Sequence, residues 1–169
     1  ERWEKRLRPY TGKIMVIDDL ANRRHDCDLL LDQNLYENME QRYEGLVPPG
    51  CRRWLGPRYA LLRPEFHEAR EHLRQRDGII RRILIFFGGS DPTNETRKAL
   101  DAIKLLDRPD IALDVVVGAN NPYRDEIREI CADMPNTSYY CQVDNMAELM
   151  AAADLAIGAG GAATWERCY

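Results

Sequence analysis

Two glycine-rich stretches of this 169-residue chain have residue types that suit phosphate chemistry. The first, Gly-Gly-Ser-Asp at positions 88–91, follows an apolar run at 83–87, and the second, Gly-Ala-Gly-Gly at 158–161, follows the apolar residues 155–157. A turn without β-carbons lets backbone N–H groups come close to phosphate oxygens, and a helix behind it directs its positive end at an anion. Either turn alone equally fits a tight connection, but two of them after apolar strands favour a phosphate or nucleotide site.

The residues behind the second turn are candidates for holding the rest of a nucleotide. The spacing predicts that Glu166 lies in the first turn of a helix, where its carboxylate can accept hydrogen bonds from a ribose diol. The helix dipole alone also favours an acid there, and Thr164 also suits a helix N-cap. Gly158, Gly160 and Ala163 fit the dinucleotide pattern G-x-G-x-x-A, but this is the last strand–turn unit and no acid follows about 20 positions later. NAD is therefore the weaker alternative.

An acidic loop near the start of the chain is a second candidate for chemistry. Asp18 and Asp19 end a short apolar run, and together with His25 and Asn34 they form a possible substrate-contacting loop. For His25 a structural or substrate-orienting role is favoured over that of a general base. The loop contains metal-ligand types, but His25 and Cys27 are followed by no second His/Cys pair at zinc-finger spacing, so we expect no metal.

Composition excludes several classes of protein and partner. A net charge of −4 without a long basic run argues against nucleic acid as the main partner. No apolar run approaches the roughly 18 residues of a membrane span. Five cysteines, an odd number without a C-x-x-C pair, indicate free and mostly buried thiols in a reducing cytoplasm. We expect no cofactor.

The apolar pattern predicts an α/β fold. Strands are expected at 13–18, 29–34, 83–87, 113–117, 137–141 and 155–157, and helices at 64–76, after the first glycine turn, after Pro122 and at 146–152. Turn signals dominate residues 37–59. Alternating buried strands and amphipathic helices predict parallel β-α-β units, whose ligand sites lie at the carboxyl ends of the strands. A boundary between two lobes is expected near residues 60–64.

Four blocks of sequence carry a resemblance to a known family. VIDDLANRRHDCDLLLDQN, LGPRYALLRPEF, ILIFFGGSDPTNET and QVDNMAELMAAADLAIGAGGAATWERC resemble the UDP-sugar hydrolases of pseudaminic acid biosynthesis in the GT-B superfamily. They are more distantly similar to the lipid II-forming N-acetylglucosaminyltransferase. The resemblance implies the Rossmann-like parallel sheets of a GT-B fold, truncated at both ends. Residues 1–62 would be the C-terminal part of the N-terminal lobe plus linker, and 63–169 an incomplete nucleotide-binding C-terminal lobe.

The resemblance also implies a site and a reaction. It assigns a UDP site in which the turn at Gly88, Gly89, Ser90 and Asp91 faces the diphosphate. Gly160, Gly161 and Thr164 approach the diphosphate from the second turn. The backbone at Val143 meets uracil, and Glu166 holds the ribose hydroxyls. It implies that water releases UDP from UDP-2,4-diacetamido-2,4,6-trideoxy-L-altrose. In the family the catalytic histidine lies in a glycine-rich loop of the N-terminal lobe, in a segment expected to be missing here, so no residue matches it. His67 and His72, on the polar side of a predicted helix, are poor replacements. A UDP-sugar glycosyltransferase and a non-catalytic nucleotide-binding module stay open as alternatives.

Overall fold

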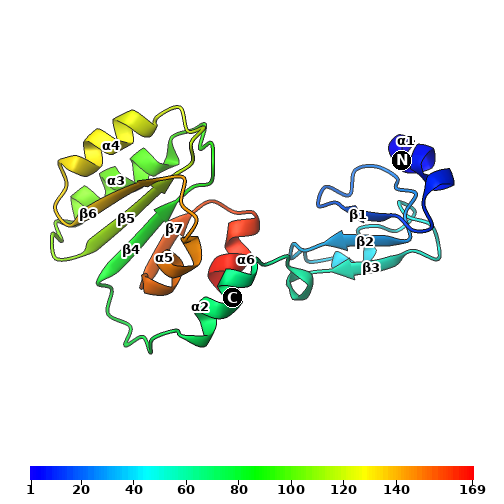
Figure 1. Ribbon diagram of the computed structural model, residues 1–169, viewed down its shortest axis with the longest axis horizontal. Helices are drawn as coiled ribbons and strands as arrows, with labels where there is room; N and C mark the ends of the chain where they lie inside the picture. The colour runs from blue at the N-terminus through cyan, green and yellow to red at the C-terminus, as the bar shows by residue number, and fades with distance from the viewer. The chain divides into compact units, whose positions relative to one another are not determined.

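The structure, a computed structural model, describes residues 1–169. The chain divides into two compact units, Glu1–Leu61 and Leu62–Tyr169, which we call unit 1 and unit 2. Each unit is built on its own parallel sheet, so the chain is an α/β protein compatible with a Rossmann-like fold (Figure 1). None of its helices has the length and apolar character that a membrane crossing requires.

Unit 1 has a three-stranded sheet in the order β1-β2-β3. Its elements are α1 (Arg2–Leu7), β1 (Met15–Ile17), β2 (Leu29–Asp32) and β3 (Arg52–Leu55), with 3-10 turns at Arg8–Tyr10, Met39–Gln41 and Pro57–Tyr59. Both strand pairs are parallel. Strand β3 was not predicted, because its Arg-Arg-Trp-Leu sequence carries charged, exposed side chains at the edge of the sheet rather than an apolar run.

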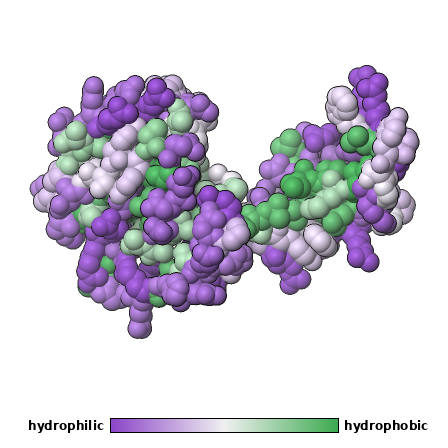
Figure 2. Space-filling view, viewed as in Figure 1, coloured by the Kyte–Doolittle hydropathy of each residue, from purple (hydrophilic) through white to green (hydrophobic).

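Only one face of the unit 1 sheet carries a core. Leu30 and Leu55 pack there with Cys27 and Tyr43. The opposite face carries Met15, Ile17 and Trp54, of which Ile17 is 60% exposed, and between them Leu31 of the central strand, which is buried. Figure 2 shows a group of hydrophobic residues on the visible surface of unit 1.

Unit 2 has a four-stranded parallel sheet in the order β6-β5-β4-β7. Its elements in chain order are α2 (Pro64–Glu71), β4 (Arg82–Phe86), α3 (Glu95–Leu106), β5 (Ala112–Val117), α4 (Arg124–Ala132), β6 (Thr137–Cys141), α5 (Met146–Ala152), β7 (Leu155–Gly158) and α6 (Ala162–Cys168). The six predicted strands are therefore all present. The chain runs outward from β4 through β5 to β6 and then returns to place β7 on the other side of β4.

Both faces of the unit 2 sheet are covered by helices. On one face, Ile85 and Val115 pack against Leu100 of α3 and Ile127 of α4. On the other face, the core of Leu84 and Val116 includes residues of α2 and α5. Figure 1 shows α3 and α4 on one side of the sheet and α2 and α5 on the other. Because β4 and β5 are buried on both sides, β4 reads as an apolar run and β5 as one interrupted only by Asp114, whose buried carboxylate pairs with Arg82, which is why the sequence located both strands well.

One predicted helix is shorter than expected. Helix α2 begins with Pro64 at its first turn, as predicted, but it ends at Glu71 rather than near residue 76. Beyond its end, Arg74 donates to the carbonyl of Ala152 and Arg76 to that of Ala153. These arginines bind carbonyls at the end of α5, where positive charge is favoured, and this tertiary contact outweighs the local helix preference.

Candidate functional site

The two glycine turns lie side by side at one edge of the unit 2 sheet. Strand β4 pairs with β7 in a register that sets Phe86 beside Gly158, and each turn begins where its strand ends. The order of the strands also reverses between β4 and β7, because the chain leaves β4 toward β5 and returns on the opposite side. Ligands of open parallel sheets bind outside the carboxyl ends of the strands at such a switch point. We call this the glycine edge, formed by Gly88, Gly89, Ser90, Gly160 and Gly161.

Two further glycines allow the backbone to pack closely beneath the glycine edge. A β-carbon on Gly118, which follows β5, would lie 2.1 Å from the carbonyl oxygen of Gly89. A β-carbon on Gly158 would lie 2.2 Å from the carbonyl oxygen of Phe86. Both positions therefore exclude any side chain. No sequence pattern distinguished Gly118 from a glycine that merely ends a strand.

The glycines of the edge itself are open toward solvent. Nothing lies within 4 Å of the β-carbon positions of Gly89 and Gly160, while Gly88 and Gly161 have positive φ angles of 89° and 113° that favour glycine. The amides of Gly88, Gly89 and Ser90 donate to no backbone carbonyl. The first turn therefore presents free N–H groups around an unfilled space.

Asp91 is turned away from this space. Its carboxylate accepts hydrogen bonds from the amides of Glu95 and Thr96, both at 2.9 Å, and from the Thr96 hydroxyl at 2.7 Å. The side chain is buried, and it satisfies amides in the first turn of α3. These contacts indicate that Asp91 caps the helix, whereas a contact with a diphosphate stays a prediction.

The second turn is held by a residue that sequence reasoning missed. Arg167 donates to the carbonyl of Ala159 at 2.7 Å and to the hydroxyl of Thr164 at 3.2 Å. Arg167 thus reaches back from α6 across the glycine turn. The three-residue spacing to Thr164, which puts both on one side of a helix, was the available signal.

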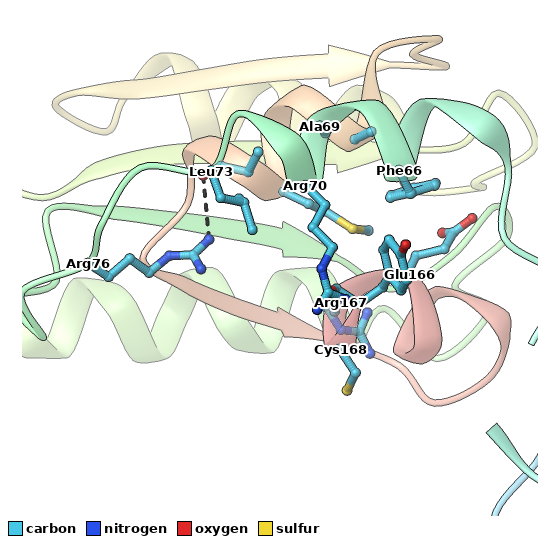
Figure 3. A pocket seen from close by; sticks show the side chains of 12 residues that line it. Phe66, Ala69, Arg70, Leu73, Arg76, Glu166, Arg167 and Cys168 are labelled. Atoms are coloured by element: carbon cyan, nitrogen blue, oxygen red, sulfur yellow. Dashed lines mark hydrogen bonds between the residues drawn. The ribbon is translucent and has the colours of Figure 1, made fainter. Parts of the chain in front are cut away.

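Glu166 does not lie in the first helical turn, as the spacing had suggested. Helix α6 begins at Ala162 after the N-cap Gly161, which puts Glu166 in the second turn and leaves the first turn without an acid. Its carboxylate accepts a 3.4 Å hydrogen bond from Arg63 Nε. The side chain borders a pocket of about 170 Å³ between α2, α5 and α6 (Figure 3). The helix-dipole explanation for this glutamate is therefore wrong, and Thr164 is not the N-cap.

Two residues that follow neighbouring strands, Val143 and Asn121, also lie at this edge of the unit 2 sheet. Val143 follows β6, its side chain packs against the core beside α5, and its N–H and carbonyl take part in no backbone hydrogen bond. Asn121 follows β5 and is 3% exposed, and its Nδ2 has no hydrogen-bond partner. Both residues leave polar groups unpaired on the side of the sheet where ligands bind.

Unit 1 has a different polar edge, built from side chains. Asp18 directly follows β1 and Asp32 ends β2, so both carboxylates lie at the carboxyl edge of the sheet. The buried Tyr43 hydroxyl joins them, at 3.1 Å from Asp18 Oδ2 and 3.0 Å from Asp32 Oδ2. We call these three residues, with Asp19, Asn34 and Arg42, the carboxylate edge. Asp32 ends an apolar run as Asp18 does, and that parallel was the signal that sequence reasoning overlooked.

Two buried groups of the carboxylate edge, Asp18 and Tyr43, have displaced pKa values. Burial opposes the ionisation of Asp18, but hydrogen bonds from the Ala21 amide and the Tyr43 hydroxyl outweigh it and lower the pKa. Burial, together with the charge of Asp32, raises the pKa of Tyr43. Arg42 Nε lies 3.5 Å from Asp32 Oδ2 and supplies a compensating positive charge. A pair of buried carboxylates is tolerable because it has both a shared donor and neighbouring cations.

The predicted substrate loop divides into buried and accessible members. His25 is buried, its Nδ1 donates to Glu4 at 2.7 Å, and its Nε2 lies 3.6 Å from Asp18. Asp19 is exposed, and Asn34 Nδ2 lies 3.4 Å from its carboxylate. The structure therefore brings Asp18, Asp19, His25 and Asn34 to one place. The burial of His25 supports the structural role that was favoured for it.

Two other expectations concern metals and thiols. No group of three His, Cys, Asp or Glu side chains in the chain has an arrangement that could hold a metal ion. All five cysteines are free thiols, but only Cys27 and Cys131 are buried, so the expectation of mostly buried thiols was wrong.

The fold and these two edges define an α/β protein with parallel sheets whose strand ends carry potential ligand sites. The chain is 35% identical over 156 residues to the spore coat polysaccharide biosynthesis protein SpsG of Bacillus subtilis, covering 92% of this chain and 45% of that protein. It is 32% identical over 149 residues to the UDP-2,4-diacetamido-2,4,6-trideoxy-beta-L-altropyranose hydrolase of Campylobacter jejuni, covering 87% of this chain and 51% of the hydrolase. These similarities support the family resemblance that the sequence blocks carry.

A third relative has a name that states no activity. The chain is 36% identical over 119 residues to the uncharacterized protein MJ1062 of Methanocaldococcus jannaschii, covering 68% of this chain and 24% of that protein. The chain thus spans between about a quarter and half the length of the curated relatives it matches. No protein-family model matches it.

Proposed function

We propose that unit 2 binds the UDP part of a UDP-sugar at the glycine edge. We further propose that the protein is a hydrolase that releases UDP from UDP-2,4-diacetamido-2,4,6-trideoxy-L-altrose in polysaccharide or pseudaminic acid biosynthesis. The observation that carries the proposal is the pair of open glycine turns on either side of the switch point between β4 and β7. The name of the Campylobacter jejuni relative supports the choice of substrate.

Each part of UDP has a proposed partner in unit 2. The unpaired amides of Gly88, Gly89 and Ser90 and the turn at Gly160 and Gly161 receive the diphosphate. Thr164 adds a hydroxyl to this group, and Asp91 supports the turn by capping α3. The free backbone groups of Val143 receive uracil. Glu166 exchanges its bond with Arg63 for the ribose hydroxyls.

The proposed reaction needs more than a nucleotide site. Water attacks the sugar nucleotide and UDP leaves, and amide donors aimed at the diphosphate stabilise the charge that develops there. A general base would add about 10²–10⁴-fold. Neither edge offers a free histidine, because His25 is buried, His67 lies on α2 and His72 directly follows that helix. We therefore expect the 169-residue chain to bind UDP but to hydrolyse UDP-sugars slowly.

We also propose a setting and an architecture. Units 1 and 2 would be parts of the two lobes of a GT-B protein, with residues 1–62 in the N-terminal lobe and 63–169 in the nucleotide-binding lobe. Asp19 and Asn34, the accessible members of the carboxylate edge, would contact polar groups of the substrate. The free thiols support a reducing, cytoplasmic setting.

Calorimetric titration of the chain with UDP, UMP and NAD tests the choice of nucleotide. We expect UDP to bind more tightly than UMP, because the second phosphate gains amide contacts at the glycine turns. NAD should bind most weakly. Tighter binding of NAD than of UDP would overturn the proposal.

Glycine-to-valine changes test the location of the site. Gly89→Val and Gly160→Val add a side chain to open positions with ordinary φ, so folding should be retained while the phosphate space is filled. We expect each change to weaken UDP binding at least tenfold, about 1.4 kcal/mol. Gly50→Val, at an equally open position in unit 1, is the matched control. Unchanged UDP affinity in either variant, with a normal melting temperature, removes that turn from the site.

Glu166 gives a separate test of the ribose contact. Glu166→Ala should weaken UDP binding by roughly 1–3 kcal/mol if the carboxylate accepts the ribose hydroxyls. Glu65→Ala is a useful control, because Glu65 also pairs with Arg63. Equal affinities of the two variants would show that only the arginine pairing was disturbed.

Glycosyl transfer is the second candidate, and it is compatible with the spore coat relative, whose name gives polysaccharide biosynthesis. The two reactions differ in their products. Incubating the protein with UDP-sugars should yield UDP and free sugar if it hydrolyses them. A sugar attached to an acceptor would support transfer instead, and UDP binding without any turnover would support a nucleotide-binding module.

A further inference from the structure

Cys27 and Cys51 form a close pair of thiols in unit 1. Their Sγ atoms lie 3.5 Å apart. Cys27 is buried in the core of the unit, and Cys51 packs against the same cluster while remaining partly exposed. The other three cysteines, Cys131, Cys141 and Cys168, all belong to unit 2.

The backbone fixes the two cysteines as neighbours. Strands β2 and β3 pair in a register that sets Leu29 beside Arg52, and the Arg52 amide donates to the Asp28 carbonyl at 2.9 Å. The Cys51 amide in turn donates to the Pro48 carbonyl at 2.9 Å. Each cysteine thus lies one or two residues before its strand, at the same end of the sheet. A disulfide has an S–S distance of about 2.05 Å, and the two sulfurs start from contact at 3.5 Å.

The segment between the two cysteines carries much of the carboxylate edge. Residues 28–50 include Asp32, Asn34, Arg42 and Tyr43. Apart from strand β2 and one 3-10 turn, this segment has no regular structure. A covalent link between its ends would restrict the loop that holds the Tyr43 hydroxyl and the Arg42 guanidinium against Asp32.

We propose that Cys27 and Cys51 are a reversible redox site that small-molecule disulfides oxidise, and that oxidation restrains the carboxylate edge. The inference does not depend on the proposed nucleotide function. In the first step the Cys51 thiolate attacks one sulfur of the small disulfide and releases one thiolate. In the second, the Cys27 thiolate attacks Cys51 Sγ and releases the other. Two protein thiols lose two electrons and two protons, and one small disulfide becomes two thiols.

The surroundings decide the order of attack. Cys51 is the accessible partner and therefore meets the oxidant. Burial, with the hydrogen bond to Cys51, raises the pKa of Cys27 to about 12, so Cys27 is mostly a thiol at neutral pH and reacts second, through its small thiolate fraction. Ring closure should consequently accelerate as pH rises, because attack requires the thiolate.

Thiol counting tests the pair directly. In the chain with Cys131, Cys141 and Cys168 replaced by alanine, oxidised glutathione should remove both remaining thiols and lower the intact mass by two hydrogens. A further Cys27→Ala change should stop the reaction at one glutathione adduct on Cys51. A further Cys51→Ala change should leave Cys27 unmodified. Two persistent thiols, a stable glutathione adduct without ring closure, or linkage between chains would each overturn the proposal.

Hydrogen exchange tests the consequence for the carboxylate edge. Oxidation should slow amide exchange across residues 28–50 at least tenfold, while unit 2 should be unchanged. Added dithiothreitol should reverse the effect. If the disulfide forms but exchange in this segment is unaltered, the restraint of the carboxylate edge is wrong. The measurement needs no nucleotide, so its failure is distinct from failure of UDP binding.

Discussion

The glycine edge of unit 2 and the carboxylate edge of unit 1 both lie at the carboxyl ends of parallel strands, but they present different chemical groups. The glycine edge presents backbone groups, and it depends on the absence of side chains at positions such as Gly118 and Gly158. The carboxylate edge presents ionisable side chains, which Tyr43 joins. A backbone edge is therefore altered by adding atoms, and a side-chain edge by removing them.

The two units also differ in how their sheets are covered. Helices bury both faces of the unit 2 sheet, where Ile85 and Val115 are fully buried. The unit 1 sheet has a core on one face, and a buried polar network lies at its edge. We therefore expect single changes in unit 2 to act through packing, and those in unit 1 to act through hydrogen bonds and charge.

The largest effect is expected for Gly118→Val. The new side chain would meet the Gly89 carbonyl, which is backbone and cannot move aside without displacing the glycine turn. We expect a loss of about 3 kcal/mol or more in the unfolding free energy of unit 2, measured by denaturant titration with hydrogen exchange to separate the units. Gly50→Val is the control. A loss below 1 kcal/mol would mean that the close packing of β4 and β5 ends is not required.

Tyr43→Phe should have the next largest effect and act on unit 1. It removes a buried hydroxyl that serves Asp18 and Asp32, at a cost of about 1–3 kcal/mol. Because the Tyr43 bond helps to lower the pKa of Asp18, its contribution is present above the ordinary value of 3.8 and fades as pH falls through the lowered pKa. Chemical denaturation at pH 7 and pH 3 measures the loss in unfolding free energy and its dependence on pH. If the difference in unfolding free energy between the wild type and the variant were larger at pH 3 than at pH 7, this account would be wrong.

The difference in how the two sheets are covered also explains which elements could be predicted from the sequence. Apolar runs such as residues 83–87 located the buried strands of unit 2 because burial on both faces leaves a continuous signal. Strand β3 was missed because an edge strand with arginines resembles a loop. The glycine turns were recognisable as local patterns, and Arg167 and Asp32 left weaker local signals, whereas Tyr43 acts through long-range contacts that no local pattern encodes.

Asp154→Asn tests a smaller electrostatic contribution within unit 2. Asp154 binds the Arg74 guanidinium and accepts from the amides of Arg81 and Arg82, which holds its pKa at about 2. A lowered carboxyl pKa stabilises the fold above the ordinary value of 3.8, and this is lost as pH falls toward 2. We expect a lower melting temperature for the variant at pH 6 and a narrowing difference below pH 4. Glu68→Gln, on the exposed side of α2, should show neither effect.

The smallest effect is expected on the uncovered face of the unit 1 sheet. Ile17 is 60% exposed, so Ile17→Thr, which keeps the β-branched shape that strands favour, should change the unfolding free energy by less than about 0.5 kcal/mol. Leu30→Ala, on the covered face of the neighbouring strand, should cost about 2–5 kcal/mol by the same measurement. A cost for Ile17→Thr that exceeds 1 kcal/mol and grows with protein concentration would mean that another copy of the chain covers this face. The contrast between a sheet covered on both faces and one covered on a single face would then hold only for the isolated chain.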